Sequence, residues 1–368
     1  MYLDSKRQGQ AGYSMVELLV SIGVLLVITS AVFALMSGSI KFANSTYQVT
    51  EAEQSLRSAH ELINRDLISA GDGLKNIGTI KVALAFASNY LTRTTIVDSS
   101  DTTHHELGIV TSDDSIPANI TVAGSSPPVT FKKNSARISV LMQDQSFNNG
   151  NPLSLLPGKI SVSGSTTSLI VGSGNIGLFQ VGEIYAIISQ NSAAFGVITG
   201  VNTTTYTMAM ATGDTFGLNE VSATAPLTAV SSIVSGQNTQ AVSLIRVQII
   251  QYYVTSTSLL MRRVLGVKGA GFTETPVAEH VTTLQFRYLT NLADANNFVQ
   301  QPITVISTPI QQSAVREVET TIEVESAQAV NTVTNANASD STNGKQHIRS
   351  TTVTSVRNLQ FGANARNQ

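Results

Sequence analysis

The feature that most constrains this 368-residue chain is a run of 23 residues, 18–40, without a charged side chain. At about 1.5 Å per residue, a helix over this run would be roughly 34 Å long, enough to cross the hydrocarbon core of a bilayer. Lys6, Arg7 and Asp4 lie in a short segment before the run, and Glu17 stands at its leading edge. The sequence therefore predicts a membrane-spanning helix near the N-terminus.

Three interpretations of this run compete. It is a signal anchor with its positive end in the cytoplasm, a secretory signal cleaved near residues 32–34, or a signal cut on the cytoplasmic side after Gly12. Only the third leaves the helix on the mature protein while removing the charged segment. A carboxylate costs roughly 2.5–3.5 kcal/mol at the bilayer centre and less near its edge, and neither of the first two signals gains from Glu17. The apolar core of a secretory signal is also only about 7–15 residues long, so the third interpretation is favoured.

Residues 12–19 read Gly-Tyr-Ser-Met-Val-Glu-Leu-Leu. This order resembles the processing motif of the type IV pilin family, except that Tyr13 stands where phenylalanine is commoner. The resemblance implies that a prepilin peptidase removes residues 1–12 and that the new amine on Tyr13 is methylated. It also implies that Glu17 pairs with the cationic amine of a neighbouring subunit, which would fix the axial register because a lone buried charge is strongly unfavourable. The alternative for Glu17 is an edge residue that reaches to the membrane surface without a partner.

The apolar helix is expected to continue beyond the membrane. Apolar side chains recur at spacings of three and four with charges between them, which predicts an amphipathic helix. The stripe consists of Val49, Ala52, Leu56, Ala59, Ile63, Leu67 and Ala70. Gly71 and Gly73 are candidates for the C-terminal cap, and no proline occurs before Pro117. We therefore expect a helix over residues 13–70, with residues 13–40 in the membrane or filament core and residues 41–71 lying against a sheet.

The end of this helix narrows the resemblance. Residues 61–74, ELINRDLISAGDGL, are similar to the helix end of PilW-type minor pilins and of the related type II secretion pseudopilin J. Strand-like runs over residues 244–360 follow the order of strands in the sheet of PilW-type proteins. The resemblance implies an α+β fold, in which a long N-terminal helix packs on an antiparallel β-sheet that carries an inserted β-rich subdomain.

The rest of the chain reads as short strands between polar turns. Residues 72–137 are assigned to the first part of the head, residues 138–245 to the inserted subdomain and residues 246–368 to the C-terminal antiparallel sheet. Only five side chains between residues 138 and 245 are charged. Strands are expected at residues 80–86, 137–142, 159–162, 168–171, 183–189, 195–201, 206–211, 244–254, 259–265, 282–289, 317–325 and 351–357.

Composition and motifs exclude several kinds of chemistry. The chain has no cysteine, which rules out disulfides and thiolate ligands. Its formal net charge of −2 and the lack of a basic tract argue against nucleic acid. No phosphate-binding loop or hydrolase motif is present, so we predict neither an enzyme nor a cofactor. Asp98, Asp101, His104 and His105 share one expected loop, but without the spacing of a calcium site, so a solvated loop is favoured over a metal site.

The resemblance thus implies a PilW-type minor pilin that co-assembles with other minor pilins to prime and cap type IV pilus assembly. The implied partners are other minor and major pilins, the prepilin peptidase and the inner-membrane assembly platform. The expected location is the bacterial inner membrane, with the N-terminus in the cytoplasm and the head outside, and then the pilus. Two alternatives stay open. One is a pseudopilin J-like subunit at a pseudopilus tip, and the other is a membrane-anchored β-rich adhesin, which would need neither Gly12 nor Glu17.

Overall fold

A computed structural model describes most of the chain. The described residues are 12, 14–74, 80–91, 104–113, 129–156, 158–163, 166–188, 193–219, 242–267, 271–291, 302–306, 309–328 and 345–356. The chain divides into two units, residues 1–51 with 326–346 and residues 52–325 with 347–368. We refer to the second unit as the head.

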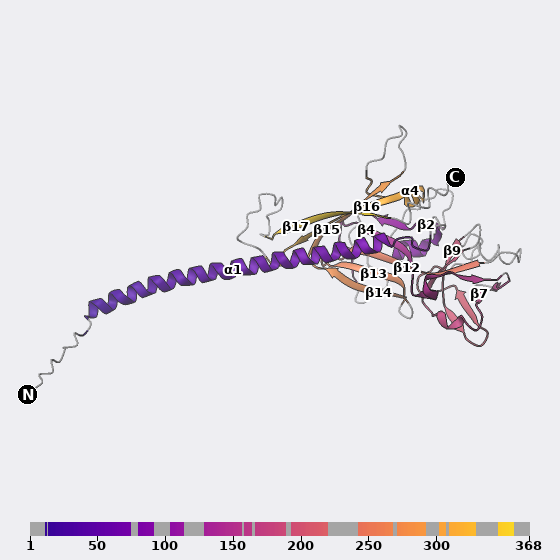
Figure 1. Ribbon diagram of the computed structural model, residues 1–368, viewed down its shortest axis with the longest axis horizontal. Helices are drawn as coiled ribbons and strands as arrows, with labels where there is room; N and C mark the ends of the chain where they lie inside the picture. Colours follow the sequence, from indigo (N-terminus) through magenta and orange to yellow (C-terminus); the bar gives the residue numbers. More distant parts are fainter. Residues whose placement is uncertain are drawn as a thin grey trace, which may run out of the picture. The chain divides into compact units, whose positions relative to one another are not determined.

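Helix α1, Met15–Ile68, is a single helix of 54 residues (Figure 1). It confirms the helix predicted over residues 13–70, although Tyr13 itself lies outside the described residues. The helix ends where the sequence places a cap, because Gly71 and Gly73 both adopt positive φ angles of 72° and 71°. The amide of Gly71 donates to the Leu141 carbonyl at 2.9 Å, which ties the end of α1 to the sheet.

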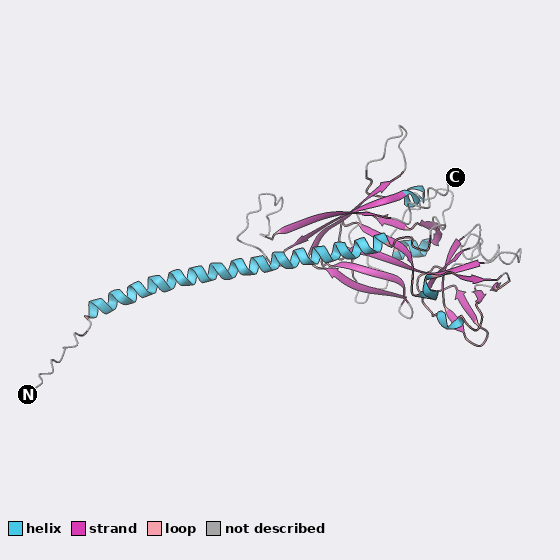
Figure 2. Cartoon of the chain, viewed as in Figure 1, coloured by secondary structure: helices cyan, strands magenta, loops and turns pink. Residues whose placement is uncertain are grey.

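Antiparallel strands make up most of the head (Figure 2). The largest sheet follows the order β14-β13-β12-β4-β3, with β5 and β8 also paired to β12 and with β9 paired to β8. Its strands are β3 Val110–Asp113, β4 Arg137–Gln143, β5 Leu153–Leu155, β8 Ile184–Ile188, β9 Ala193–Val197, β12 Val242–Val254, β13 Leu260–Val267 and β14 Gly271–Ala278.

Three smaller sheets complete the described part of the head. A three-stranded sheet has the order β15-β16-β17, a four-stranded sheet the order β10-β11-β7-β6, and β1 pairs with β2. Their strands are β1 Ile80–Ala83, β2 His104–Leu107, β6 Ile160–Ser163, β7 Thr166–Ile170, β10 Gly200–Asn202, β11 Thr207–Ala211, β15 Val281–Thr290, β16 Val315–Glu325 and β17 His347–Ser355. The short helices are α2 Leu84–Tyr90, η1 Phe147–Gly150, η2 Ile176–Leu178 and α4 Pro309–Ala314.

Strand β12 belongs to all three large hydrophobic cores. Ile250, Tyr252 and Val254 pack with the second half of α1 and with β15 and β16. The opposite face of β12, which includes Ile249, packs with α2, β1 and β9. Leu244, near the start of β12, packs with β7 and β11. Ile249 lies on one face of β12 and Leu244 and Ile250 on the other, because successive residues point to opposite faces. Leu244 and Ile250 reach different cores because they lie at different positions along this long strand.

The independent inserted subdomain expected over residues 138–245 is not confirmed. Strands form near the predicted positions, but β4, β5 and β8 all pair directly with β12. The proposed limit at residue 245 therefore cuts through β12. Among the described strands of this range, only β6, β7, β10 and β11 form a sheet of their own, and that sheet still packs on the start of β12.

Several expected strands in the C-terminal part are confirmed. The strands expected at residues 244–254 and 259–265 form β12 and β13, which pair with each other. The strand expected at residues 282–289 forms β15, in which the alternate residues Leu284, Phe286 and Tyr288 are buried on one face. Two local predictions are wrong. Residues 84–86 belong to helix α2 rather than to a strand, and His104 and His105 lie in β2 rather than in a loop.

Candidate functional site

The segment around the predicted processing site begins just before helix α1. Gly12 is exposed and lies outside the helix, which starts at Met15. Tyr13 lies outside the described residues. Exposed, non-helical backbone near a terminus is the kind of backbone that proteases reach most easily. The described part of this segment is therefore accessible to a peptidase acting at Gly12.

Ser14 caps the N-terminus of α1, a role that the sequence analysis missed. The Glu17 amide donates to the Ser14 hydroxyl oxygen and the Leu18 amide donates to the Ser14 carbonyl, both at 3.2 Å. Ser14 and Glu17 also have the Ser-x-x-Glu spacing of a capping box, which was visible in the sequence. Glu17 in the first turn is further favoured by the positive end of the helix dipole.

The carboxylate of Glu17 is exposed to solvent at the start of α1. Among the described residues, no side chain donates a hydrogen bond to it or forms an ion pair with it. The partner implied by the pilin resemblance is the N-terminal amine of another subunit, which a single chain does not contain. The pairing therefore stays a prediction.

The first half of α1 presents apolar side chains around its whole circumference. The large apolar side chains between Met15 and Phe42 are 49–88% exposed. The hydroxyls of Ser21 and Thr29 donate to the carbonyls of Glu17 and Leu25, four residues earlier, so these polar groups are satisfied within the helix. This part of α1 is long and apolar enough to cross a membrane and could anchor the protein there.

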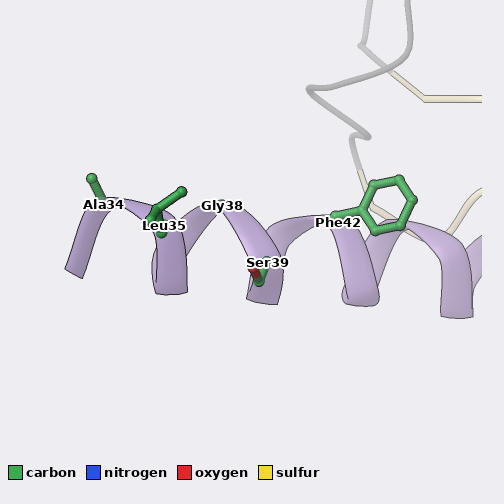
Figure 3. Close-up of a pocket in the computed structure, with 5 residues that line it drawn as sticks. All are labelled: Ala34, Leu35, Gly38, Ser39 and Phe42. Carbon is green, nitrogen blue, oxygen red and sulfur yellow. The ribbon is translucent and has the colours of Figure 1, made fainter. Parts of the chain in front are cut away.

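A shallow depression lies on one side of this apolar helix (Figure 3). The small residues Ala34, Gly38 and Ser39 form it, with Leu35 and Phe42 beside them. A Cβ added at Gly38 would meet no atom within 4 Å. Small residues four positions apart let a second helix approach closely, so this face is suited to helix packing.

The second half of α1 packs one face against the head, and Figure 1 shows it beside β13 and β15. Ala59 and Ile63 are fully buried, and Leu67 is 1% exposed. These residues belong to the predicted stripe, which therefore forms the contact with the sheets. His60 is also buried, and its Nδ1 lies 2.9 Å from the Thr352 hydroxyl on β17.

A buried ion pair fixes the end of α1 to the largest sheet. The Asp66 carboxylate accepts hydrogen bonds from Arg262 Nε and from the Tyr252 hydroxyl, both at 2.6 Å. Asp66 is 3% exposed. Burial, and then the negative charge of Asp66, raise the pKa of the Tyr252 hydroxyl well above its usual range, so it stays a donor. The sequence analysis placed Asp66 among the charged residues between the stripe positions and gave no signal of this role.

Glycine is required at positions 71 and 73, after α1, for different geometric reasons. Gly71 donates to Leu141, as described above, and its positive φ suits glycine. A Cβ at Gly73 would collide with the side-chain amide of Gln143 on β4. Both glycines therefore help to seat the end of α1 on the sheet.

A second charged cluster lies where β4, β8 and β12 meet. Arg246 donates to Asp144 at 2.9 Å and to Glu183 at 2.7 Å, and the Tyr185 hydroxyl donates to Glu183 at 2.8 Å. Burial, and then the charge of Glu183, raise the pKa of Tyr185 well above its usual range. Two of the five charges between residues 138 and 245, Asp144 and Glu183, are thus paired with Arg246, which makes the cluster structural.

The described residues contain no group of three or more His, Asp or Glu side chains that could hold a metal ion. Of the four residues weighed for such a site, Asp98 and Asp101 lie outside the described residues, and His105 is buried in β2.

No family model, curated protein or solved structure matches this chain.

Proposed function

We propose that this protein is a PilW-type minor pilin, a structural subunit that joins other pilins through its N-terminal helix and primes type IV pilus assembly. The observation that carries the proposal is the spacing of Gly12 and Glu17 ahead of a charge-free helix. Its role is assembly rather than catalysis. The head would lie outside the inner membrane, and the subunit would stand at or near the tip of the filament.

The geometry of α1 supports a helix that lies in lipid before assembly and against other helices in the filament. Its first half exposes large apolar side chains on all sides, which suits lipid before assembly. The small residues Ala34 and Gly38 suit close packing against other helices afterwards. A carboxylate at Glu17 in such a bundle would require a cationic partner, and an N-terminal amine created at Tyr13 supplies one.

The proposal also includes two partners in the membrane, the prepilin peptidase and the assembly platform. The prepilin peptidase would act at Gly12 on the cytoplasmic side, and the assembly platform would extract the processed subunit from the membrane. A pseudopilin J-like subunit of type II secretion would use the same segment in the same way. A membrane-anchored adhesin would need neither processing at Gly12 nor a charge at Glu17.

The N-terminal sequence and mass of the protein, measured in membrane and sheared-filament fractions, test the proposal. A chain that starts at Tyr13, with or without a methyl group, is expected. The Gly12→Ala variant should stay at full length in the membrane, because the peptidase motif would be lost. A wild-type chain that starts at Met1 would indicate a plain anchor, and a start near Leu35 a secreted protein; either result would end the pilin proposal.

The charge of Glu17 can be tested separately from helix capping. Glu17→Ala should be processed normally but should enter filaments at least about tenfold less, because the buried amine would lose its partner. Ser14→Ala is the matched control, since it removes the cap at a cost of about 1 kcal/mol and keeps the charge. Incorporation is measured by quantitative immunoblotting of sheared filaments. Equal incorporation of Glu17→Ala and wild type would refute the pairing.

A further inference from the structure

The eight-stranded sheet has β14 at one edge, and the three-stranded sheet has β15 and β17 at its edges. These edge strands differ in how they are protected against pairing with another chain. β15 has its outer edge occupied, because the Leu284 carbonyl accepts from Ala136 and Tyr288 exchanges two backbone hydrogen bonds with Ile303. β14 carries Pro276, which has no amide hydrogen, and two register shifts against β13. Proline and bulges are known protections of an edge against pairing with other chains.

β17 lacks these protections. It pairs with β16 over nine residues in a continuous register and, among the described strands, with no other. Its sequence, HIRSTTVTS, contains no proline or glycine and is rich in β-branched residues. A long, regular edge of this kind offers a row of unpaired backbone groups to another strand.

The direction of these backbone groups follows from the register. The Val356 amide donates to the Arg316 carbonyl, so even-numbered residues of β17 bond to β16. The amides and carbonyls of the odd-numbered residues therefore point away from β16. The side chains of these same residues lie on the face opposite α1, because Thr352 and Thr354 face His60 and Asn64 of the helix.

The side chains on the face of β17 opposite α1 indicate which residues a partner strand should carry. Arg349 is exposed and forms no ion pair with any described residue, because Glu323, opposite it on β16, is held by His347 at 2.9 Å. Val353, four residues further on, is 60% exposed. A second β17 strand would contain no acid to place opposite Arg349.

We infer that the outer edge of β17 binds an extended segment of another protein by strand addition. The segment runs antiparallel and places an apolar residue opposite Val353 and, four residues later, an acid opposite Arg349. In the proposed pilus a neighbouring subunit would supply this segment, but the inference rests on β17 alone. It fails or holds independently of processing at Gly12.

A defined peptide tests this inference on the full-length protein in detergent. The probe is a fluorescent ten-residue peptide with Val, Thr and Glu at alternate positions, N-methylated on the intervening residues so that it can pair along one edge only. A second peptide has Lys in place of Glu. Fluorescence anisotropy should show binding of the Glu peptide and about two- to fivefold weaker binding of the Lys peptide, as a cross-strand charge pair predicts.

Three variants identify the surface. Thr351→Pro removes an outward amide and keeps the backbone hydrogen bonds to β16, and it should weaken binding at least tenfold. Thr351→Val loses the same side-chain hydrogen bond to Thr321 at 2.9 Å but keeps the amide, so it should bind like wild type. Arg349→Glu should reverse the preference to the Lys peptide, which decides the question if Thr351→Pro fails to fold. Binding of neither peptide, or binding unchanged by these variants, would overturn the inference.

Two further results would assign the edge to another occupant and overturn the inference. The chain has no native cysteine, so a Val353→Cys variant reports self-association directly. A disulfide-linked dimer of this variant at low concentration would indicate a second copy of the chain. Peptide binding that appears only after deletion of residues 357–368 would assign the edge to the protein's own C-terminal segment.

Discussion

The two halves of helix α1 lie in one continuous element but have opposite relations to their surroundings. Val27, in the first half, is 70% exposed, whereas Ile63, in the second half, is fully buried. The first half shows no polar face, and the second half shows a stripe at spacings of three and four. The comparison teaches that one helix can carry two binding surfaces, one completed by the chain's own sheets and one that needs lipid or other helices.

The largest expected effect is a difference in stability between the same truncation made in each half of α1. Ile63→Ala should lower the free energy of unfolding of the head by about 3 kcal/mol, because it leaves a cavity in a fully buried site. Ile28→Ala, the same change in the first half, should alter it by less than about 0.5 kcal/mol. Urea unfolding in detergent, followed by circular dichroism, measures both. Equal effects would show that the comparison between the halves is wrong.

A second prediction concerns the ion pair that holds the end of the helix. Asp66→Ala should destabilise the head by about 3 kcal/mol, because Arg262 and Tyr252 would lose their shared acceptor. The double variant Asp66→Leu with Arg262→Met should recover part of this loss. Arg65→Ala is the exposed control and should cost less than about 1 kcal/mol. Unfolding of wild type and the three variants under one condition shows whether the apolar pair recovers stability, and the absence of any recovery would contradict this explanation.

The smallest effect is a pH dependence at His60. Burial lowers the pKa of His60 below its ordinary value of 6.5, so the folded protein favours the neutral ring. Stability from this residue is therefore present above about pH 6.5 and is lost as the pH falls through that value, since the unfolded chain then binds the proton more readily. His60→Gln should flatten the slope of unfolding free energy between pH 7.5 and pH 5.5. An unchanged slope would show that His60 does not contribute.

The features that could be predicted from sequence are those encoded by neighbouring residues. The charge-free run, the stripe that includes Leu56 and Leu67, and the glycines that end the helix each depend on short-range spacing or backbone preference. The strand expected at residues 317–325, which forms most of β16, also needed no knowledge of its partners, because valine, threonine and isoleucine alternate there with glutamate and threonine. The Ser14 cap was available to the same reasoning through its Ser-x-x-Glu spacing.

The features that escaped prediction depend on residues far apart in the chain. Asp66 could not be distinguished from the exposed charges near it, because Arg262 lies 196 residues away. The apparent insert over residues 138–245 looked independent because its strands are short and local, whereas three of them pair with β12. Glu17 is a different case, since its spacing suggests a role but its expected partner belongs to another molecule.

The sharing of β12 among three cores has a consequence for how the protein is made. β4, β5 and β8 precede β12 in the chain, and each takes it as a partner. During synthesis helix α1 therefore emerges first, while β4, β5 and β8 each keep at least one edge unpaired until residues 242–254 have followed. Unpaired strands are prone to aggregate during such an interval. The order of the chain thus sets the completion of one late strand in competition with misassembly of the earlier ones.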